Sequence, residues 1–287
     1  MILLQTPSLK SIIKPILYLI LFFVILTYAS KFGALYAVLA FLAILAAIYI
    51  AKRASILSLM ATFKFKKDRQ KSFELFEKAY KTGKMKPQTA LYYSYLLLRD
   101  GKLAESDRKF DEILSKYKSK LSETDKNNAY LNKSLVKWKS GDLKGALKDA
   151  QALYDDGYKT TALYGVLGYW YDLDGQYEKA LEINKEAREY NSDDLIIADN
   201  LAQNYFLVGE IEKSHDMYVD ILNKDPQFIE PYYNFALVLD SLGEYDDALE
   251  ELENALSMQE KFLSTVTHDM VRAKIEEIKN KKNKKKE

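Results

Sequence analysis

Residues 161–194, TALYGVLGYWYDLDGQYEKALEINKEAREYNSDD, hold the pattern that decides the fold. Hydrophobic residues there follow the spacing of two amphipathic helices, one on each side of Gly175. Glycine recurs at intervals of 34 residues, at Gly141, Gly175, Gly209 and Gly243. A glycine at such a place supplies the backbone freedom that ends a helix. The interval therefore predicts an all-α chain built from repeated helix pairs.

Small residues recur in register with these glycines, five residues after each and seven residues before each. They are Ala146, Ala180, Ser214 and Ala248 after the glycines, and Ser134, Gly168, Ala202 and Ala236 before them. Small side chains at both places allow two antiparallel helices to approach closely. We therefore expect tight packing inside each pair.

The 34-residue unit resembles the tetratricopeptide repeat (TPR), which is a helix, a turn and a second helix. Units 161–194, 195–228 and 229–262 carry the likeness most fully. In the first of these, the signature places of the family are filled by Tyr164, Leu167, Gly168, Tyr171, Gly175, Tyr177, Ala180 and Ala187. The resemblance implies a TPR-type helical solenoid, a right-handed superhelix of stacked units.

Three weaker units precede these. Units 87–120 and 127–160 keep the turn glycine and are separated by six extra residues, whereas residues 53–86 fit the register without a turn glycine. We expect residues 53–86 to be a degenerate repeat that caps the stack. In unit 127–160, Lys133 and Lys137 stand at places that are usually apolar, so either its first helix is rotated or these lysines snorkel.

The chain beyond the repeats is expected to close the stack. Residues 263–278 are predicted to form a capping helix with Val271, Ile275 and Ile278 on one face, because the last repeat would otherwise expose its stacking surface. Residues 279–287 contain six Lys and form a Lys-rich tail in this interpretation. The tail either solubilises the chain or contacts anionic lipid headgroups.

Two apolar stretches precede the repeats, at about residues 11–30 and 34–51. Each is close to the length that crosses the hydrocarbon of a bilayer, and Lys14 near one end can snorkel to the headgroups. Only residues 31–33 join them, so residues 1–52 are predicted to contain an antiparallel two-helix transmembrane hairpin. A cleaved signal peptide fits less well, because a second apolar segment follows at once.

Positive charge indicates the orientation of the hairpin. Two Lys precede the first span, one Lys lies in the turn, and five Lys or Arg lie between residues 52 and 67. Both termini and the repeats should therefore be cytoplasmic. The abundance of Lys, Ile, Asn and Tyr is typical of an AT-rich bacterial genome, so we expect an integral protein of a bacterial cell membrane.

Composition excludes several classes of function. Residues 68–278 carry 28 Lys or Arg against 40 Asp or Glu, a net charge of −12 that disfavours binding to nucleic acid. The chain has no Cys and only two His, neither at metal-ligand spacing from a partner. It also lacks a phosphate-binding glycine loop and a nucleophile elbow. We therefore expect no cofactor, no metal and no enzymatic activity.

The resemblance also indicates which residues could bind a partner, since TPR proteins usually hold peptide segments on the concave wall formed by the first helix of each unit. Transferred by position, these residues form what we call the first-helix wall. Its N-terminal part is apolar and consists of Leu91, Tyr95, Leu98, Leu131, Leu135, Trp138 and Tyr169. Its C-terminal part is largely acidic and consists of Asp172, Asp199, Gln203, Phe206, Glu230, Tyr233 and Asp240. Some of these side chains could instead pack between units.

The resemblance and the predicted anchor together favour a membrane-bound adaptor or scaffold that binds other proteins, while residues 11–51 contact the lipid bilayer. An apolar wall that grades into an acidic one suits partner segments with apolar anchors and basic flanks. Two alternatives stay open: an assembly or quality-control factor for envelope or secretion machinery, and a self-associating structural membrane protein. The sequence does not indicate the partner or the oligomeric state.

Overall fold

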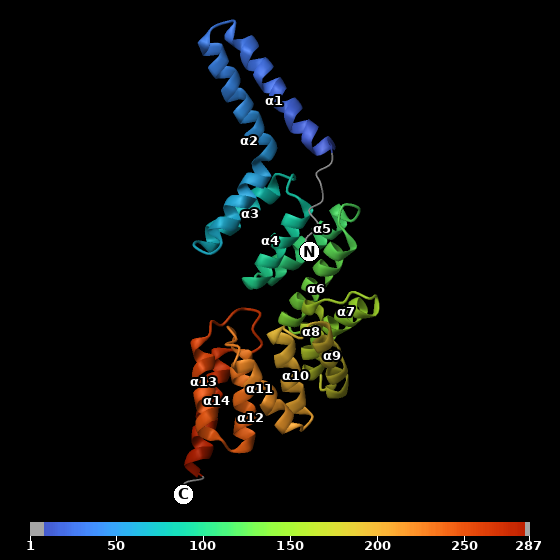
Figure 1. The fold of residues 1–287 in the computed structure, drawn as a ribbon, viewed down its shortest axis with the longest axis vertical. Coiled ribbons are helices and arrows are strands. Elements are labelled where there is room, and N and C mark those ends of the chain that lie inside the picture. The colour runs from blue at the N-terminus through green and yellow to red at the C-terminus, as the bar shows by residue number, and fades with distance from the viewer. Residues whose placement is uncertain (1–8, 285–287) are drawn as a thin grey trace. The chain divides into compact units, whose positions relative to one another are not determined.

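The computed structural model describes residues 9–284, and within that range every regular element is a helix. The chain divides into two compact units, Met1–Thr89 and Ala90–Glu287 (Figure 1). The N-terminal segment before residue 9 and the last three residues of the predicted Lys-rich tail lie outside the described residues. Each unit is described below by itself.

The first unit begins with a helical hairpin, made of α1 (Leu9–Ser30) and α2 (Ala34–Lys64). The turn between them contains Gly33 at a φ of 115°, a conformation that glycine adopts without steric cost. Phe22 on α1 and Phe41 on α2 pack edge to face, with ring centroids 6.1 Å apart. The two helices are therefore antiparallel neighbours, as a three-residue connection requires.

The hairpin exposes its apolar side chains. Among the described residues, α2 is the one helix long and apolar enough to cross a membrane, and Leu17–Ser30 forms a shorter apolar stretch. None of the most apolar 18-residue window of α2 is buried in the fold. An apolar helix in the core of a soluble protein would instead be largely covered.

Helix α2 continues without a break beyond its apolar part and packs against α3 (Arg69–Lys81). Asp68 caps the start of α3 by accepting a hydrogen bond from the Lys71 amide at 2.9 Å. The Ser72 hydroxyl donates to the Ala61 carbonyl across the two helices at 2.7 Å. The end of the second apolar stretch is thus part of a folded helix pair.

The second unit is a series of helix pairs. Its first helix, α4 (Pro87–Arg99), begins just before the division between the units. The helices that follow are α5 (Leu103–Tyr117), α6 (Glu123–Lys139), α7 (Leu143–Asp155), α8 (Thr161–Leu173), α9 (Tyr177–Tyr190), α10 (Leu195–Leu207), α11 (Ile211–Leu222), α12 (Glu230–Leu242), α13 (Tyr245–Ser257) and α14 (His268–Lys284).

The helices of each pair meet at the small residues that recur in the sequence. All eight of these residues are buried, including Gly168 and Ala180 at the contact of α8 with α9. The Ser214 hydroxyl donates to the Ala202 carbonyl across α10 and α11 at 2.8 Å, the equivalent of the bond between α2 and α3. Close packing therefore holds the two helices of a pair together, and a hydrogen bond is added in the pairs where the second helix carries Ser72, Ser106 or Ser214.

The lysines at apolar places of unit 127–160 snorkel, and α6 keeps its place in the stack. The Lys133 amine donates to Asp107 and Asp111 on α5, at 2.7 Å in each case, and the Lys137 amine donates to Asp149 on α7 at 2.5 Å. Burial lowers the pKa of Lys133, but the two aspartates outweigh it and hold that pKa above its ordinary value. The aliphatic stems can thus stay among apolar neighbours while the charges are paired.

The C-terminal helix differs from its predicted extent. It begins at His268 and continues to Lys284, so the lysines between 279 and 284 are helical and do not form a tail. Val271 and Ile278 are buried against the last helix pair, and Ile275 packs beside them. Lys274 and Lys281 both contact Asp240 on α12, with N–O distances of 2.8 and 2.7 Å. Opposite charge on α12 explains why the helix extends into the Lys-rich region.

The contact of α8 with α9 supplies a matched pair of glycine substitutions. A methyl group on Gly168 would overlap the buried side-chain amide of Asn184, whereas one on Gly165, three residues earlier in α8, would make only an ordinary 3.6 Å contact with Ile196. We expect G168A to lower the free energy of unfolding by about 1–3 kcal/mol, because the helices must separate. We expect G165A to be neutral, or stabilising by about 0.5–1 kcal/mol through helix propensity. Denaturant unfolding measures both; equal effects would contradict the proposed close approach.

Candidate partner-binding wall

The first-helix wall is distributed over five helices of the second unit. Its members are Leu91, Tyr95 and Leu98 on α4, Leu131, Leu135 and Trp138 on α6, Tyr169 and Asp172 on α8, Asp199, Gln203 and Phe206 on α10, and Glu230, Tyr233 and Asp240 on α12. Each of these helices is the first of its pair. A glycine with positive φ follows each helix and ends it, so the wall residues lie before that glycine.

Only part of the apolar half of the wall is accessible. Leu98 and Leu131 are buried between helices. These two residues therefore pack inside the stack and do not face a partner. Tyr95, Leu135, Trp138 and Leu91 are half-buried. These four side chains remain candidates for contact with a partner.

Trp138 is the centre of an aromatic cluster that joins two repeats. Its ring packs edge to face on Tyr169, with centroids 6.0 Å apart, and lies 5.9 Å from the ring of Trp170. Trp170 is fully buried, whereas Trp138 is partly exposed. Burial raises the pKa of Tyr169 to about 12. Trp138 is thus supported by packed aromatic rings and keeps part of its surface exposed.

Two of the expected acidic wall residues are buried and do not line an open surface. Asp199 is 3% exposed and accepts hydrogen bonds from Asn234 at 3.1 Å and from the Tyr218 hydroxyl at 3.2 Å. Asp172 is 6% exposed and accepts a hydrogen bond from Asn204 at 2.6 Å. Burial raises the pKa of each aspartate to about 7, against the opposing effect of these hydrogen bonds.

The other two carboxylates of the wall are occupied by the chain itself. Asp240 contacts Lys274 and Lys281 of α14, as described above. A Glu230 carboxylate oxygen accepts hydrogen bonds from the Thr265 amide at 2.7 Å and from the Thr265 hydroxyl at 3.2 Å. The expectation of an acidic surface open to a basic partner therefore needs correction, since none of its four carboxylates is free.

The segment that reaches Glu230 could not be placed on the wall from the sequence. Residues 258–267, which we call the 258–267 loop, join α13 to α14 and lie against the wall. The Lys139 amine, next to Trp138, donates to the Ser264 carbonyl of the loop at 2.9 Å. This contact joins residues 125 apart, and helical periodicity does not report on loops of this kind.

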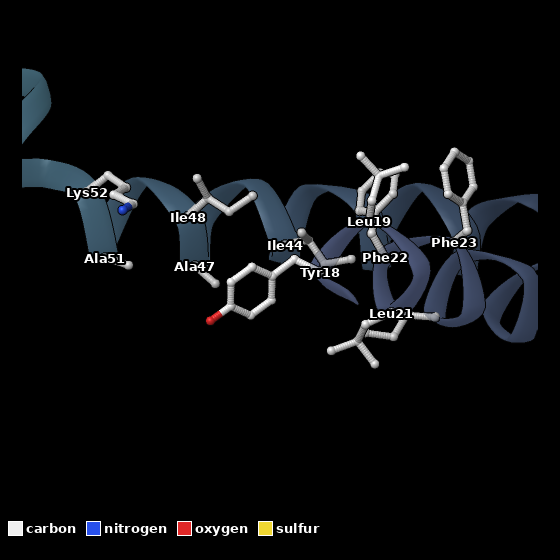
Figure 2. Close-up of a pocket in the computed structure, with 11 residues that line it drawn as sticks. Tyr18, Leu19, Leu21, Phe22, Phe23, Ile44, Ala47, Ile48, Ala51 and Lys52 are labelled. Atoms are coloured by element: carbon white, nitrogen blue, oxygen red, sulfur yellow. The ribbon is translucent and has the colours of Figure 1, made fainter. Parts of the chain in front are cut away.

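A second hollow surface is a groove along the hairpin, between α1 and α2. Figure 2 shows that Tyr18 and Lys52 alone bring polar atoms among the labelled side chains. The groove is therefore suited to apolar contact.

Metal ligands do not cluster in the described part of the chain. Among the residues that the structure describes, no group of three His, Asp or Glu is placed to hold a metal ion.

Solved structures share this architecture. A tetratricopeptide repeat protein from Parabacteroides merdae superposes with a TM-score of 0.63, at 11% sequence identity over 90% of this chain and 98% of that one. The thermophilic TPR protein TTC0263 of Thermus thermophilus gives a TM-score of 0.53, at 19% identity over 67% of this chain and 98% of its own. The chain has a TPR fold.

Curated proteins with TPR names are similar in sequence, although no family model matches the chain. TPR repeat-containing protein YpiA of Bacillus subtilis is 25% identical over 166 residues, or 56% of this chain and 38% of that protein. A TPR repeat-containing protein of Methanocaldococcus jannaschii is 29% identical over 171 residues, or 54% of this chain and 30% of that protein. The chain thus matches less than two fifths of the length of either relative. TPR folds typically serve as non-enzymatic modules for protein–protein interaction.

The buried aspartates make TPR stability dependent on pH. The folded state holds the pKa of Asp199 at about 7 against an ordinary 3.8, so between these values it binds a proton that the unfolded chain has lost. Stability should therefore fall as pH rises from about 4 to about 7 and stay lower above it. We expect D199N, which keeps an acceptor for Asn234, to stabilise the protein by roughly 1–3 kcal/mol at pH 8 and little at pH 4.

The matched control for this prediction is D220N, because Asp220 is exposed on the neighbouring helix α11. Thermal unfolding of wild type, D199N and D220N at both pH values gives the comparison. A stability of D199N that follows the wild-type pH profile would show that Asp199 is not the titrating group.

Proposed function

We propose that the protein is a membrane-anchored adaptor or scaffold that binds other proteins through its TPR unit. The proposal rests on the exposed apolar hairpin. Its second helix, α2, is also the first helix of the pair that it forms with α3, and this pair is of the repeat type. Such an anchor would hold the binding wall near the membrane surface. An assembly or quality-control factor for envelope or secretion machinery, and a self-associating structural protein, remain the alternatives.

The dimensions and side chains of the hairpin support a membrane location. The 18 residues from Ala34 to Ala51 extend about 27 Å as a helix, close to the hydrocarbon thickness of a bilayer. Tyr28 and Tyr36 lie near the turn, whereas Tyr18 and Tyr49 lie near the opposite ends of the apolar stretches of α1 and α2. Tyrosine is enriched where a bilayer meets water. The hairpin groove of Figure 2 would then be filled by acyl chains or a second helix.

Helix α2 joins the second apolar stretch directly to the folded α2–α3 pair, where Ala54, Leu57 and Ala61 are buried. The hydrogen bond from Ser72 to Ala61 belongs to the same contact. The second apolar stretch is thus continuous with a helix that packs in the first unit, as expected for a retained anchor.

The charges proposed to set the orientation lie where the helices leave the apolar region. Lys52 and Arg53 directly follow the apolar part of α2, and Lys64, Lys66 and Lys67 lie at the end of this helix and just after it. The turn carries a single Lys. This asymmetry favours a cytoplasmic location for both termini and for the repeats.

The proposed partners are protein segments with apolar anchors, because the accessible part of the wall is aromatic and aliphatic. Related folds occur in protein assemblies: a crystal structure of an APC/C hetero-tetramer gives a TM-score of 0.57, at 17% identity over 83% of this chain and 42% of that one. Basic flanks on a partner would meet the acidic field of the unit, and not Asp172, Asp199, Glu230 or Asp240 directly.

The topology can be tested because the chain has no Cys. A membrane-impermeant maleimide should label K31C in intact spheroplasts, since Lys31 lies in the turn on the outer side. It should label K66C only after the membrane is permeabilised. The cysteine-free parent is the control for background. Labelling of K66C in intact spheroplasts would place the repeats outside and reverse the proposed orientation.

Partner capture can be tested with two aromatic residues of α6. Trp138 lies on the wall, whereas Tyr130 is exposed elsewhere on the same helix. We expect W138A to weaken capture of co-purifying proteins about tenfold or more, because aromatic anchors typically contribute about 2 kcal/mol, and Y130A to retain capture. Quantitative pull-down in mild detergent, with melting temperatures of both variants, provides the measurement. Full capture by a folded W138A would exclude this wall as the partner surface.

A further inference from the structure

The 258–267 loop lies across the first-helix wall in the place proposed for a partner. Its attachments extend from the turn after α4 to the start of α12, although the loop follows α13 in the chain. From this geometry we infer that the loop is an internal ligand of the wall, and that partner segments bind by displacing it. The inference rests on the proposed function of the wall as a protein-binding surface.

Phe262 is the apolar anchor of the loop. Its ring lies on Gly101, where a Cβ atom would be only 3.1 Å from two ring carbons, so a larger residue at position 101 would push the ring away by a few tenths of an ångström. The Lys139 amine lies 5.6 Å from the centre of the Phe262 ring and 4.3 Å from that of Trp138. One cation thus links the loop to the aromatic cluster of the wall.

The backbone of the loop is held by polar groups of the wall. Lys139 binds the Ser264 carbonyl, and Glu230 binds the Thr265 amide and hydroxyl. Burial lowers the pKa of Lys139, with partial compensation from Glu230 and from Glu260 of the loop. The loop is thus held by backbone hydrogen bonds and by an anchoring side chain, which are also the contacts that hold a bound peptide.

The base of the loop is fastened separately from its tip. The His268 ring nitrogen Nε2 contacts the Met258 carbonyl at 2.9 Å, and the His268 amide donates to Glu260 at 2.7 Å. Val266 is buried with the residues that hold α14. Residues 261–265 can therefore leave the wall while α14 stays docked.

The tip is also held weakly enough to be displaced. The Phe262 side chain remains 40% exposed where it lies on Gly101, and Lys261 is exposed. A competing segment would need an aromatic ring that packs on Gly101. Close after it, the segment would need a carbonyl that accepts a hydrogen bond from Lys139 and an N–H that donates to Glu230. The partner chemistry is thus a segment with an aromatic anchor and a Ser or Thr three residues after it, in a turn like that of residues 261–264, where the Ser264 amide donates to the Lys261 carbonyl at 2.9 Å.

A peptide with the sequence of the loop, MQEKFLSTVT (residues 258–267), is the probe that tests this inference. Fluorescence anisotropy would measure its binding to the full chain in detergent, and to a variant in which residues 261–265 are replaced by GSGSG. We expect at least tenfold tighter binding to the replacement variant, because a site that is mostly occupied shows a proportionally reduced affinity. A peptide with Ala in place of the Phe should bind neither protein measurably.

Single substitutions keep the test decisive if the replacement variant does not fold. F262A removes the anchor and should give the same direction of change, whereas Q259A alters an exposed residue of the loop and should bind the peptide as weakly as wild type. Equal peptide binding to wild type and F262A, or no binding to either, would overturn the inference.

The peptide experiment and the capture experiment can fail independently, so the internal ligand and the adaptor function are tested separately. If W138A abolishes protein capture while the peptide does not distinguish wild type from F262A, the wall binds partners and the internal ligand is excluded. If the peptide distinguishes them but no protein is captured, the loop occupies the wall as inferred and the adaptor function fails.

Discussion

The close approach of two antiparallel helices at small buried residues is the constraint on which the rest of the structure depends. Where Gly168 meets Asn184, no methyl group fits, and where Ser214 meets Ala202 a hydrogen bond closes the contact. Each pair formed in this way can bury its remaining apolar face only against a neighbouring pair. The 34-residue interval therefore determines both the packing within a pair and the direction in which the stack grows.

This dependence explains which features were predictable from the sequence. Small residues and turn glycines act locally, so the helix pairs, the all-α class and the solenoid follow from their spacing. The environment of a side chain depends on neighbours distant in sequence, and Asp199 illustrates the limit: its position indicated a wall residue, but Tyr218 and Asn234 enclose it. Lys133 shows the opposite case, since carboxylates on α5 make an apparently misplaced charge compatible with the fold.

The least predictable feature is the 258–267 loop, because it has no periodicity and its contacts are made with helices far earlier in the chain. It changes the interpretation of the wall from an open groove to a surface with an occupant. The carboxylates assigned to basic partners are used inside the chain, by Thr265 and by lysines of α14. What remains accessible is aromatic and aliphatic, so recognition in the proposed function depends on an apolar anchor more than on charge.

A photo-crosslinking measurement tests the central claim, that the first helices form the face at which partners bind. Benzoylphenylalanine would replace Tyr169 on the wall or Tyr190 on the second helix of the same pair, in the full chain within its membrane. We expect position 169 to crosslink to residues 258–267 or to a partner protein, and position 190, which is exposed, to capture neither. Capture of partners from position 190 and not from position 169 would contradict it.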